Sequence, residues 1–137
     1  MLAPMWIFSA TQGDPMLLDS CAGLRQMHET LTRFIASSAE TLALPACTKG
    51  NPAPYDRFLD GLRIVKRDGE ASLVLGPDNW LELAALEPEL KRLTDEVLVE
   101  EETDHHHWCT RPISLIIEAD TIWVNEHESW ERADHES

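Results

Sequence analysis

The chain has little positive charge. Only 11 of its 137 residues are Lys or Arg, against 25 Asp or Glu, so the formal net charge is -14. Proteins bind nucleic acid and anionic membranes through clustered Lys and Arg, and this chain lacks such clusters. No apolar run approaches the roughly 20 residues that cross a bilayer. We therefore expect no nucleic-acid partner and no membrane partner.

Cysteine is scarce as well. The three cysteines, Cys21, Cys47 and Cys109, are an odd number without CxxC spacing, which fits a reducing compartment better than a disulfide framework. The apolar N-terminal residues 1–8 contain no basic region, so they do not make a convincing signal peptide. Both features favour a cytoplasmic protein.

Catalytic motifs are missing too. The sequence contains no GxSxG, no Gly-rich phosphate loop and no Ser/His/Asp order that stands out. General acid–base chemistry needs a base that a third group orients, and a nucleophile or substrate within reach. Without such a set we expect a binding protein and not an enzyme.

What the chain does have is a globular composition. Apolar residues make up 43% of it and charged residues 26%, which argues against wholesale disorder. At this length we expect one domain over residues 1–137. A proline-bearing segment, 39–55, predicts a long loop with at most a short strand or helical turn at 41–43. Residues 129–137 predict an acidic tail.

Short apolar runs around turn residues predict three β-hairpins. The Asp68-Gly69 pair between residues 62–66 and 71–75 is the strongest of these turn sequences. The other two hairpins are expected to pair residues 6–10 with 16–18, and residues 113–118 with 121–125.

Two amphipathic helices are predicted between the hairpins. The first begins at Asp19 or Ser20, either of which can accept backbone N–H bonds as an N-cap, and ends near Ser38. The second covers residues 80–93. We expect it to kink or restart at Pro88, because proline removes an N–H donor and clashes with the preceding turn.

These elements predict an α+β fold. Its expected form is a two-layer sandwich, in which a mostly antiparallel sheet carries two main helices on one face. The halves 5–67 and 71–125 also look alike, which suggests an internal β-α-β duplication. The alignment matches Met16-Leu17-Leu18 with Leu73-Val74-Leu75, Leu24 with Leu81, and Leu62 to Val65 with Leu115 to Glu118.

Acidic residues are concentrated in the last third of the chain. Residues 95–137 hold 13 Asp or Glu and 2 Lys or Arg. Such a field steers a basic protein and speeds its association in a salt-dependent manner. In the other interpretation the acids merely solubilise a short edge strand at 97–99. Under the docking interpretation, the partner-binding residues are Glu100, Glu101, Glu102, Asp104, Trp108, Glu118 and Asp120.

Trp108 and its neighbours support more than one interpretation. Trp108 is either a central interface anchor or a cap on the core at the entrance to a strand. His105 and His107 stand as His-x-His, which puts both imidazoles on one side of an extended segment. With Cys109 they could hold zinc or nickel, although no second ligand pair stands at a familiar distance. We expect no resident cofactor, and a metal-binding regulatory or accessory module is the alternative function.

A family resemblance rests on the stretch from Leu73 to Ile117. A strand and an amphipathic helix lead to His105 and His107, and the aromatic Trp108 follows them. A closing strand covers Leu115 to Glu118. This succession resembles small bacterial immunity proteins of polymorphic, contact-dependent or type VI secretion toxin systems, in which an Asp/Gly-His-x-His-Leu turn precedes a Leu-Val-Ile-Glu strand. Trp108 stands in place of the Leu.

The resemblance implies a function for the acidity. It implies a cytoplasmic protein that binds one cognate toxin and blocks it, with no catalysis of its own. Many secreted nuclease toxins are basic, so a net charge of -14 agrees with this role. The oligomeric state and the toxin's identity do not follow from the sequence.

Overall fold

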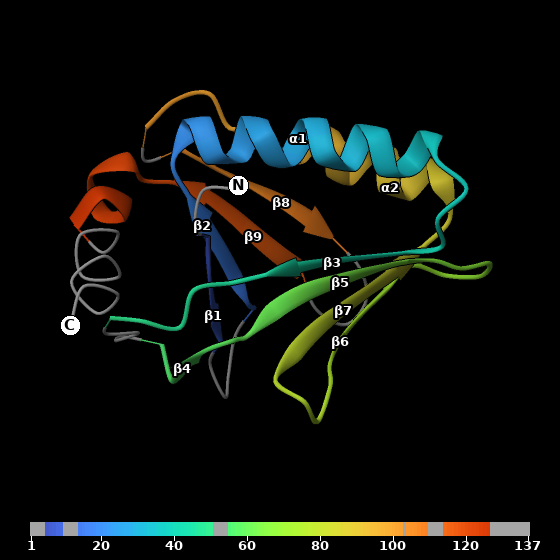
Figure 1. The fold of residues 1–137 in the computed structure, drawn as a ribbon, viewed down its shortest axis with the longest axis horizontal. Helices are drawn as coiled ribbons and strands as arrows, with labels where there is room; N and C mark the ends of the chain where they lie inside the picture. Colours follow the sequence, from blue (N-terminus) through green and yellow to red (C-terminus); the bar gives the residue numbers. More distant parts are fainter. Residues whose placement is uncertain (1–4, 10–13, 51–54, 103, 110–113, 127–137) are drawn as a thin grey trace.

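Two β-sheets and two long helices make up most of the described part of the chain. The computed structural model describes residues 5–9, 14–50, 55–102, 104–109 and 114–126. They form an α+β fold (Figure 1). The helices are α1 (Cys21–Ala36) and α2 (Glu87–Glu96), and residues 121–126 are also helical. The strands are β1 (Trp6–Ser9), β2 (Met16–Asp19), β3 (Thr41–Pro45), β4 (Arg57–Phe58), β5 (Gly61–Lys66), β6 (Ser72–Leu75), β7 (Trp80–Ala85), β8 (His105–Cys109) and β9 (Ser114–Ala119).

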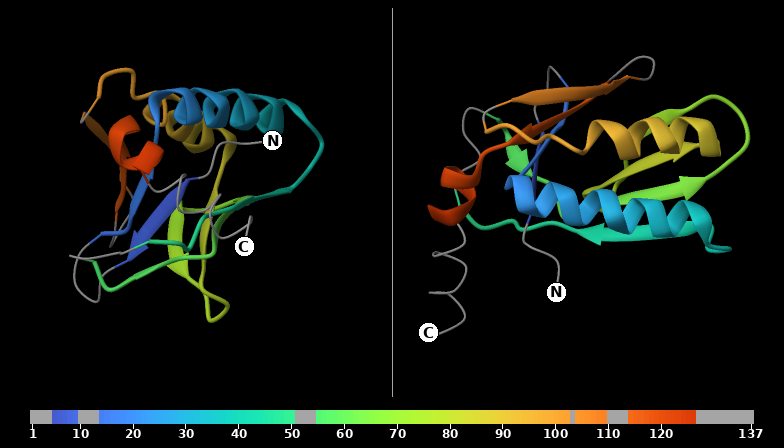
Figure 2. Two further views of the ribbon diagram at one scale, coloured as in Figure 1. Left: turned by 60° about the vertical axis from the view of Figure 1, so that its left-hand side comes forward. Right: turned by 90° about the horizontal axis from the view of Figure 1, so that it is seen from above.

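The strands divide between a five-stranded and a four-stranded sheet. Sheet A has the order β4-β1-β2-β9-β8, and sheet B has the order β3-β5-β7-β6. Each contains one parallel pair, β2 with β9 and β5 with β7, among antiparallel neighbours. The α+β class and the mostly antiparallel pairing are therefore confirmed, whereas the expectation of a single sheet is wrong. α1 and α2 lie side by side along one side of the two sheets (Figures 1 and 2).

The first predicted helix is confirmed as α1. Ser20 is its N-cap, and the Ser20 hydroxyl accepts a hydrogen bond of 3.0 Å from the Gly23 N–H. This bond satisfies one of the backbone donors that a helix start leaves unpaired. The apolar residues recur every three or four positions and are buried as one stripe: Leu24, Met27, Leu31 and Phe34.

The second predicted helix is half wrong. Trp80–Ala85, expected to be helical, is strand β7, with Leu81 and Leu83 buried and Glu82 between them half-exposed. This alternation is that of a strand. α2 begins only at Glu87, so Pro88 lies in its first turn. A proline is tolerated there because the first N–H groups of a helix have no partner within the helix.

We expect Pro88→Ala to change the free energy of unfolding by no more than about 0.5 kcal/mol, because no intrahelical hydrogen bond is regained. Lys91→Pro is the contrasting variant: it places proline in the helix interior and should cost about 3 kcal/mol. Denaturant unfolding measures both. A gain of about 2 kcal/mol for Pro88→Ala would show instead that the proline interrupts the helix.

One of the three predicted hairpins is confirmed. β1 and β2 pair antiparallel, with Ile7 opposite Leu17. Of the turn expected at residues 12–15, residues 12 and 13 lie outside the described residues. β5 and β6 do not pair, because β7 lies between them and pairs with both. The expected strand at 121–125 is helical, and β9 pairs with β8 and β2 instead.

Two short segments also differ from expectation. The segment 39–55 was predicted to be a loop with at most a short strand or helical turn at 41–43. It contains the five-residue strand β3, which confirms the strand alternative but is longer, and which pairs along its whole length with β5. Residues 97–99 do not form the predicted edge strand. Val97 and Val99 instead follow α2 and are buried in the core, so their apolar character reflects packing and not strand pairing.

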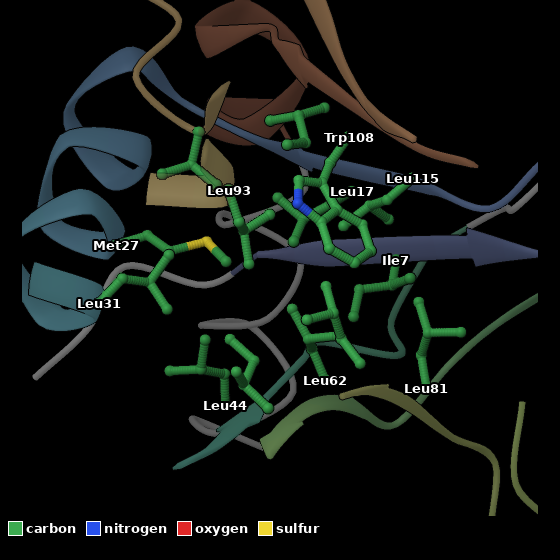
Figure 3. Close-up of a cluster of buried hydrophobic side chains, with 14 of the residues drawn as sticks. Ile7, Leu17, Met27, Leu31, Leu44, Leu62, Leu81, Leu93, Trp108 and Leu115 are labelled. Carbon is green, nitrogen blue, oxygen red and sulfur yellow. The ribbon is translucent and has the colours of Figure 1, made fainter. Parts of the chain in front are cut away.

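The main core lies where both sheets meet the helix pair. Trp108 and Leu93 lie on one side of this core, and Leu62 of β5 lies on the other side (Figure 3). A second apolar cluster covers the opposite face of sheet A, beneath the helical residues 121–126. Trp6 packs edge-on against Trp123 there, with ring centroids 4.8 Å apart. The second cluster contains Trp6, Phe8, Met16, Leu18, Phe58 and Val124.

The two halves of the chain share one topology. β1-β2-α1-β3-β5 and β6-β7-α2-β8-β9 have the same order, with β4 added in the first half. The pair Ile7 and Leu17 recurs 66 positions later as Leu73 and Leu83. The parallel contact of Met16 with Ile116 corresponds to that of Glu82 with Arg63: Glu82 follows Met16 by 66 positions, and Ile116 follows Arg63 by 53.

This correspondence differs from the predicted alignment in one respect. β1 corresponds to β6 and β2 to β7, so matching Met16–Leu18 with Leu73–Leu75 is wrong. That alignment also set Leu24 of α1 against Leu81, which lies on a strand. The match of Leu62 to Val65 with Leu115 to Glu118 does join corresponding strands, β5 and β9.

Candidate functional site

The connection from α2 to β8 carries the exposed acidic residues. Glu100, Glu101 and Asp104 are all exposed. The chain around Asp104 lies beside the end of β9, where the Ala119 N–H donates a 3.2 Å hydrogen bond to the Asp104 carbonyl. The segments 100–104 and 118–121, distant in sequence, therefore form one acidic face.

Unbalanced charge distinguishes this face. Within the described residues, Glu100 and Glu101 form no ion pair, and the Lys and Arg ion pairs lie elsewhere, as in Lys91 with Glu87. Among the described residues, the side chain within ion-pair distance of Asp104 is His106, whose Nε2 lies 3.9 Å from Asp104 Oδ2 and which carries a charge only when protonated. A face with so little internal compensation leaves its carboxylates available to an external cation.

Two of the predicted docking residues instead hold the chain in place. Glu102 accepts a 2.8 Å hydrogen bond from the Thr121 N–H and another from the Thr121 hydroxyl. Asp120 accepts a 3.0 Å bond from the Trp123 N–H. Both carboxylates therefore satisfy donors at the start of the helical residues 121–126.

The pKa of the Glu102 carboxyl lies below its usual value, mainly because the Thr121 hydroxyl and then the Thr121 N–H donate to it. A carboxyl whose pKa is lowered by folding stabilises the fold above its unfolded pKa, and that contribution is lost as the pH falls through the folded value. We expect acidification below about pH 4 to loosen the 121–126 turn.

Amide exchange of Thr121, followed by NMR across this pH range, measures the loosening. In Glu102→Gln the acid-dependent change should disappear, because the glutamine side chain does not titrate. An unchanged acid response in that variant would assign the transition to another group.

Glu118 lies in a different environment. It is opposite His105 in the β8–β9 pair and is partly buried. Burial raises the pKa of the Glu118 carboxyl, the negative charge of Asp120 adds to this effect, and His105 opposes it. Glu118 is therefore a less available anion than the exposed residues of the same face.

Cys21 does not have the activated thiol that a helix start could provide. Burial raises the pKa of the Cys21 thiol, and the hydrogen bond of 3.2 Å to Glu102 Oε1, together with the charge of that carboxylate, raises it further. Nearby Arg25 has the opposite, smaller effect. A thiol with a raised pKa is a poor nucleophile at neutral pH.

Trp108 is part of the core and not an exposed anchor. Its side chain is fully buried, and its indole N–H donates a 3.1 Å hydrogen bond to the Glu89 carbonyl in α2. Among its neighbours in the core is Leu115 (Figure 3). The interpretation of Trp108 as a partner-binding residue is therefore wrong, and the interpretation as a core position holds.

The histidines of β8 alternate across the strand. His105 and His107 are exposed with ring centroids 5.2 Å apart, as the His-x-His spacing predicts. His106 faces the helix layer, where its Nδ1 lies 2.9 Å from the Glu96 carbonyl oxygen.

Of the three predicted metal ligands, the structure describes the side chains of His105 and His107. No group of three or more His, Cys, Asp or Glu side chains in the described part of the chain could hold a metal ion. Cys109 lies in β8, but its side chain is outside the described residues. Two imidazoles are fewer than the four ligands of a structural zinc site.

A groove that the sequence did not indicate runs between α1 and α2. Its volume is about 470 Å³, and its walls combine charged and apolar side chains. Two of its lining residues are in contact: His28 Nδ1 lies 2.7 Å from the Thr94 carbonyl oxygen. The sequence analysis expected the second helix to begin near residue 80, whereas α2 begins at Glu87. The residues that α2 presents to α1 were therefore not predicted. The groove is lined by His28, Thr32, Ile35, Ala36, Glu87, Lys91, Thr94 and Asp95.

Comparison with protein-family models, curated proteins and solved structures found no match to this chain. None of the helices formed by the described residues is long and apolar enough to cross a membrane.

Proposed function

We propose that this protein binds a basic protein through its acidic face, and that it acts as an immunity protein that neutralises a cognate toxin. The observation that carries the proposal is the exposure of Glu100 and Glu101 next to Asp104, together with their lack of an ion pair to any residue that the structure describes. Buried Trp108 and the capping residues Glu102 and Asp120 hold this face in position. Catalysis by this chain is not part of the proposal.

The charge of the whole chain supports a basic partner. A net charge of -14 produces a long-range field that raises the rate of encounter with a cation-rich surface and weakens as salt is added. Exposed carboxylates at the rim of an interface change association rates more than dissociation rates. Neutralisation of a toxin benefits from fast capture, so this composition suits the proposed role.

The first experiment is to capture the partner from the source organism's lysate at low salt, release it by a salt step and identify it by mass. Metal content is recorded on the same sample. The proposal expects a stoichiometric basic protein that is toxic when expressed alone and harmless when co-expressed with this chain. A partner without toxicity, or no partner, contradicts the immunity function.

The captured partner then allows a charge-reversal test. We expect Glu100→Lys with Glu101→Lys to slow association by about tenfold at low salt and to flatten its salt dependence. Glu29→Lys with Glu40→Lys is the matched control, because both residues are exposed and the change in net charge is the same. Equal slowing in both variants would show that net charge matters and that this face does not.

A further inference from the structure

The edge strand β6 lacks the protection that the other sheet edges have. β4 has only two residues, β8 carries three histidines, and β3 ends in Pro45. β6 is Ser72-Leu73-Val74-Leu75, with no charge and no proline, and Val74 and Leu75 are 56% and 38% exposed. Natural proteins usually shorten, charge or cover such an edge, because its free backbone groups can pair with another strand.

The corresponding edge in sheet A is covered by the chain itself. β1 occupies the position of β6 in the first half, and β4 pairs antiparallel with it. The Ile7 carbonyl accepts a 2.8 Å hydrogen bond from the Leu59 N–H, and the Ser9 carbonyl accepts one of 2.8 Å from the Asp56 N–H. The same positions in β6, 66 residues later, are Leu73 and Leu75.

The backbone of β6 faces outward at these same two positions. The Gly76 N–H donates a 2.9 Å bond to the Trp80 carbonyl, so Gly76 is bonded toward β7. Hydrogen bonding alternates along an antiparallel strand, which turns the N–H and C=O groups of Leu73 and Leu75 away from β7. No other strand of the described chain pairs with β6. The edge therefore presents the bonding pattern that β1 uses to hold β4.

The charge beside β6 specifies the kind of strand that fits. The nearby cations are engaged, since Arg63 pairs with Asp78 at 3.2 Å and Arg67 with Glu82 at 3.9 Å. Asp68 and Glu70, just before β6, are exposed and form no ion pair within the described residues. In an antiparallel pairing, residues that follow the partner's strand would lie beside these two acids.

We infer that the β6 edge binds an extended segment of a basic protein as an added antiparallel strand. The segment places an apolar side chain beside exposed Val74 and Lys or Arg beside Glu70 and Asp68. Main-chain hydrogen bonds to Leu73 and Leu75 supply affinity, and the apolar and basic positions supply specificity. This surface is separate from the acidic face, and the inference holds whether or not the partner is a toxin.

A designed peptide tests the inference on the full chain. Its sequence is acetyl-Thr-Arg-Phe-Leu-Thr-Val-Lys-Val-Lys-amide, in which Arg-Phe-Leu copies Arg57 to Leu59 and the lysines reach Glu70 and Asp68 in the β1–β4 register. NMR titration should perturb the amides of Leu73 and Leu75 and protect them from exchange. A control peptide with Pro for Leu and both Val keeps the charge but cannot form a strand.

Two variants separate backbone pairing from side-chain contact. Leu75→Pro removes an N–H that points away from β7, so it spares the β6–β7 ladder and should weaken peptide binding about tenfold. Leu75→Thr keeps the N–H and should bind within about threefold of the wild type. If Leu75→Pro fails to fold, Asp68→Lys with Glu70→Lys replaces it and should also weaken binding about tenfold.

Three outcomes overturn the inference. The control peptide could bind as tightly, which would show charge attraction without strand addition. The perturbed amides could lie at Glu100 and Glu101 and not in β6, which would assign the peptide to the acidic face. Sedimentation could show a wild-type dimer that Leu75→Pro dissociates, which would make a second copy of this chain the occupant of the edge.

Discussion

Replacing Trp108 by alanine is expected to lower the free energy of unfolding by about 3 to 5 kcal/mol, enough to unfold a marginally stable domain. The indole is fully buried where α2, β8 and β9 meet, so its removal leaves a cavity that the surrounding side chains cannot fill. The change also leaves the Glu89 carbonyl without the indole N–H that now donates to it.

Denaturant unfolding followed by circular dichroism measures the loss. Trp108→Phe is an informative intermediate, because it keeps an aromatic ring and removes only the hydrogen bond and part of the volume; we expect a loss of about 1 to 2 kcal/mol. Ile122→Ala is the surface control, since Ile122 is 73% exposed and should change stability by no more than about 0.5 kcal/mol. A wild-type stability in Trp108→Ala would return this residue to the candidate interface.

The second large effect is expected at Gly61, the first residue of β5. A Cβ atom at this position would lie 2.4 Å from the Trp80 ring and 2.7 Å from the Leu44 carbonyl oxygen. The ring is partly exposed and can turn aside, but the carbonyl belongs to the paired strand β3 and cannot move without shifting the sheet. Gly61→Ala should therefore cost about 2 to 3 kcal/mol.

A double variant identifies the source of this strain. Trp80→Ala alone removes the ring and its contact with Arg63, whose guanidinium lies 5.2 Å from the ring centroid. If the ring causes the clash, Gly61→Ala should cost little in that background; if the Leu44 carbonyl causes it, most of the loss should remain. We expect most of it to remain, and near-complete rescue would contradict that assignment.

The acidic face and the β6 edge lie on different sheets. Glu100 and Asp104 adjoin the end of β9 in sheet A, whereas Val74 belongs to sheet B. In a partner that used both surfaces, the acidic face would attract the partner during association, and the β6 edge would form main-chain hydrogen bonds with it. Charge reversal at Glu100 and Glu101 should then act on the association rate, and Leu75→Pro on the dissociation rate.

Local features of the chain were predictable where the pattern was long or contained a strong capping residue. α1 spans 16 residues, has Ser20 as its N-cap and buries one continuous stripe, so its period of 3.6 and its start were visible without any tertiary contact. The short β1–β2 hairpin was visible for a similar reason, since its partners are close in sequence. The alternation of His105 and His107 followed from strand geometry alone.

The sequence by itself therefore determined the α+β class, the first helix, most strand positions and the acidic balance. Only the tertiary structure decided that Trp80–Ala85 is a strand. Six residues rich in apolar side chains are compatible with the period of a helix and with that of a strand, and pairing with β5 and β6 selects the strand. It also decided which acids hydrogen-bond within the chain: Glu102, although exposed, caps a turn that begins 19 residues later in the chain. The tertiary structure likewise decided that Trp108 is buried in the core. Such contacts join residues far apart in sequence, and local propensity carries no information about them.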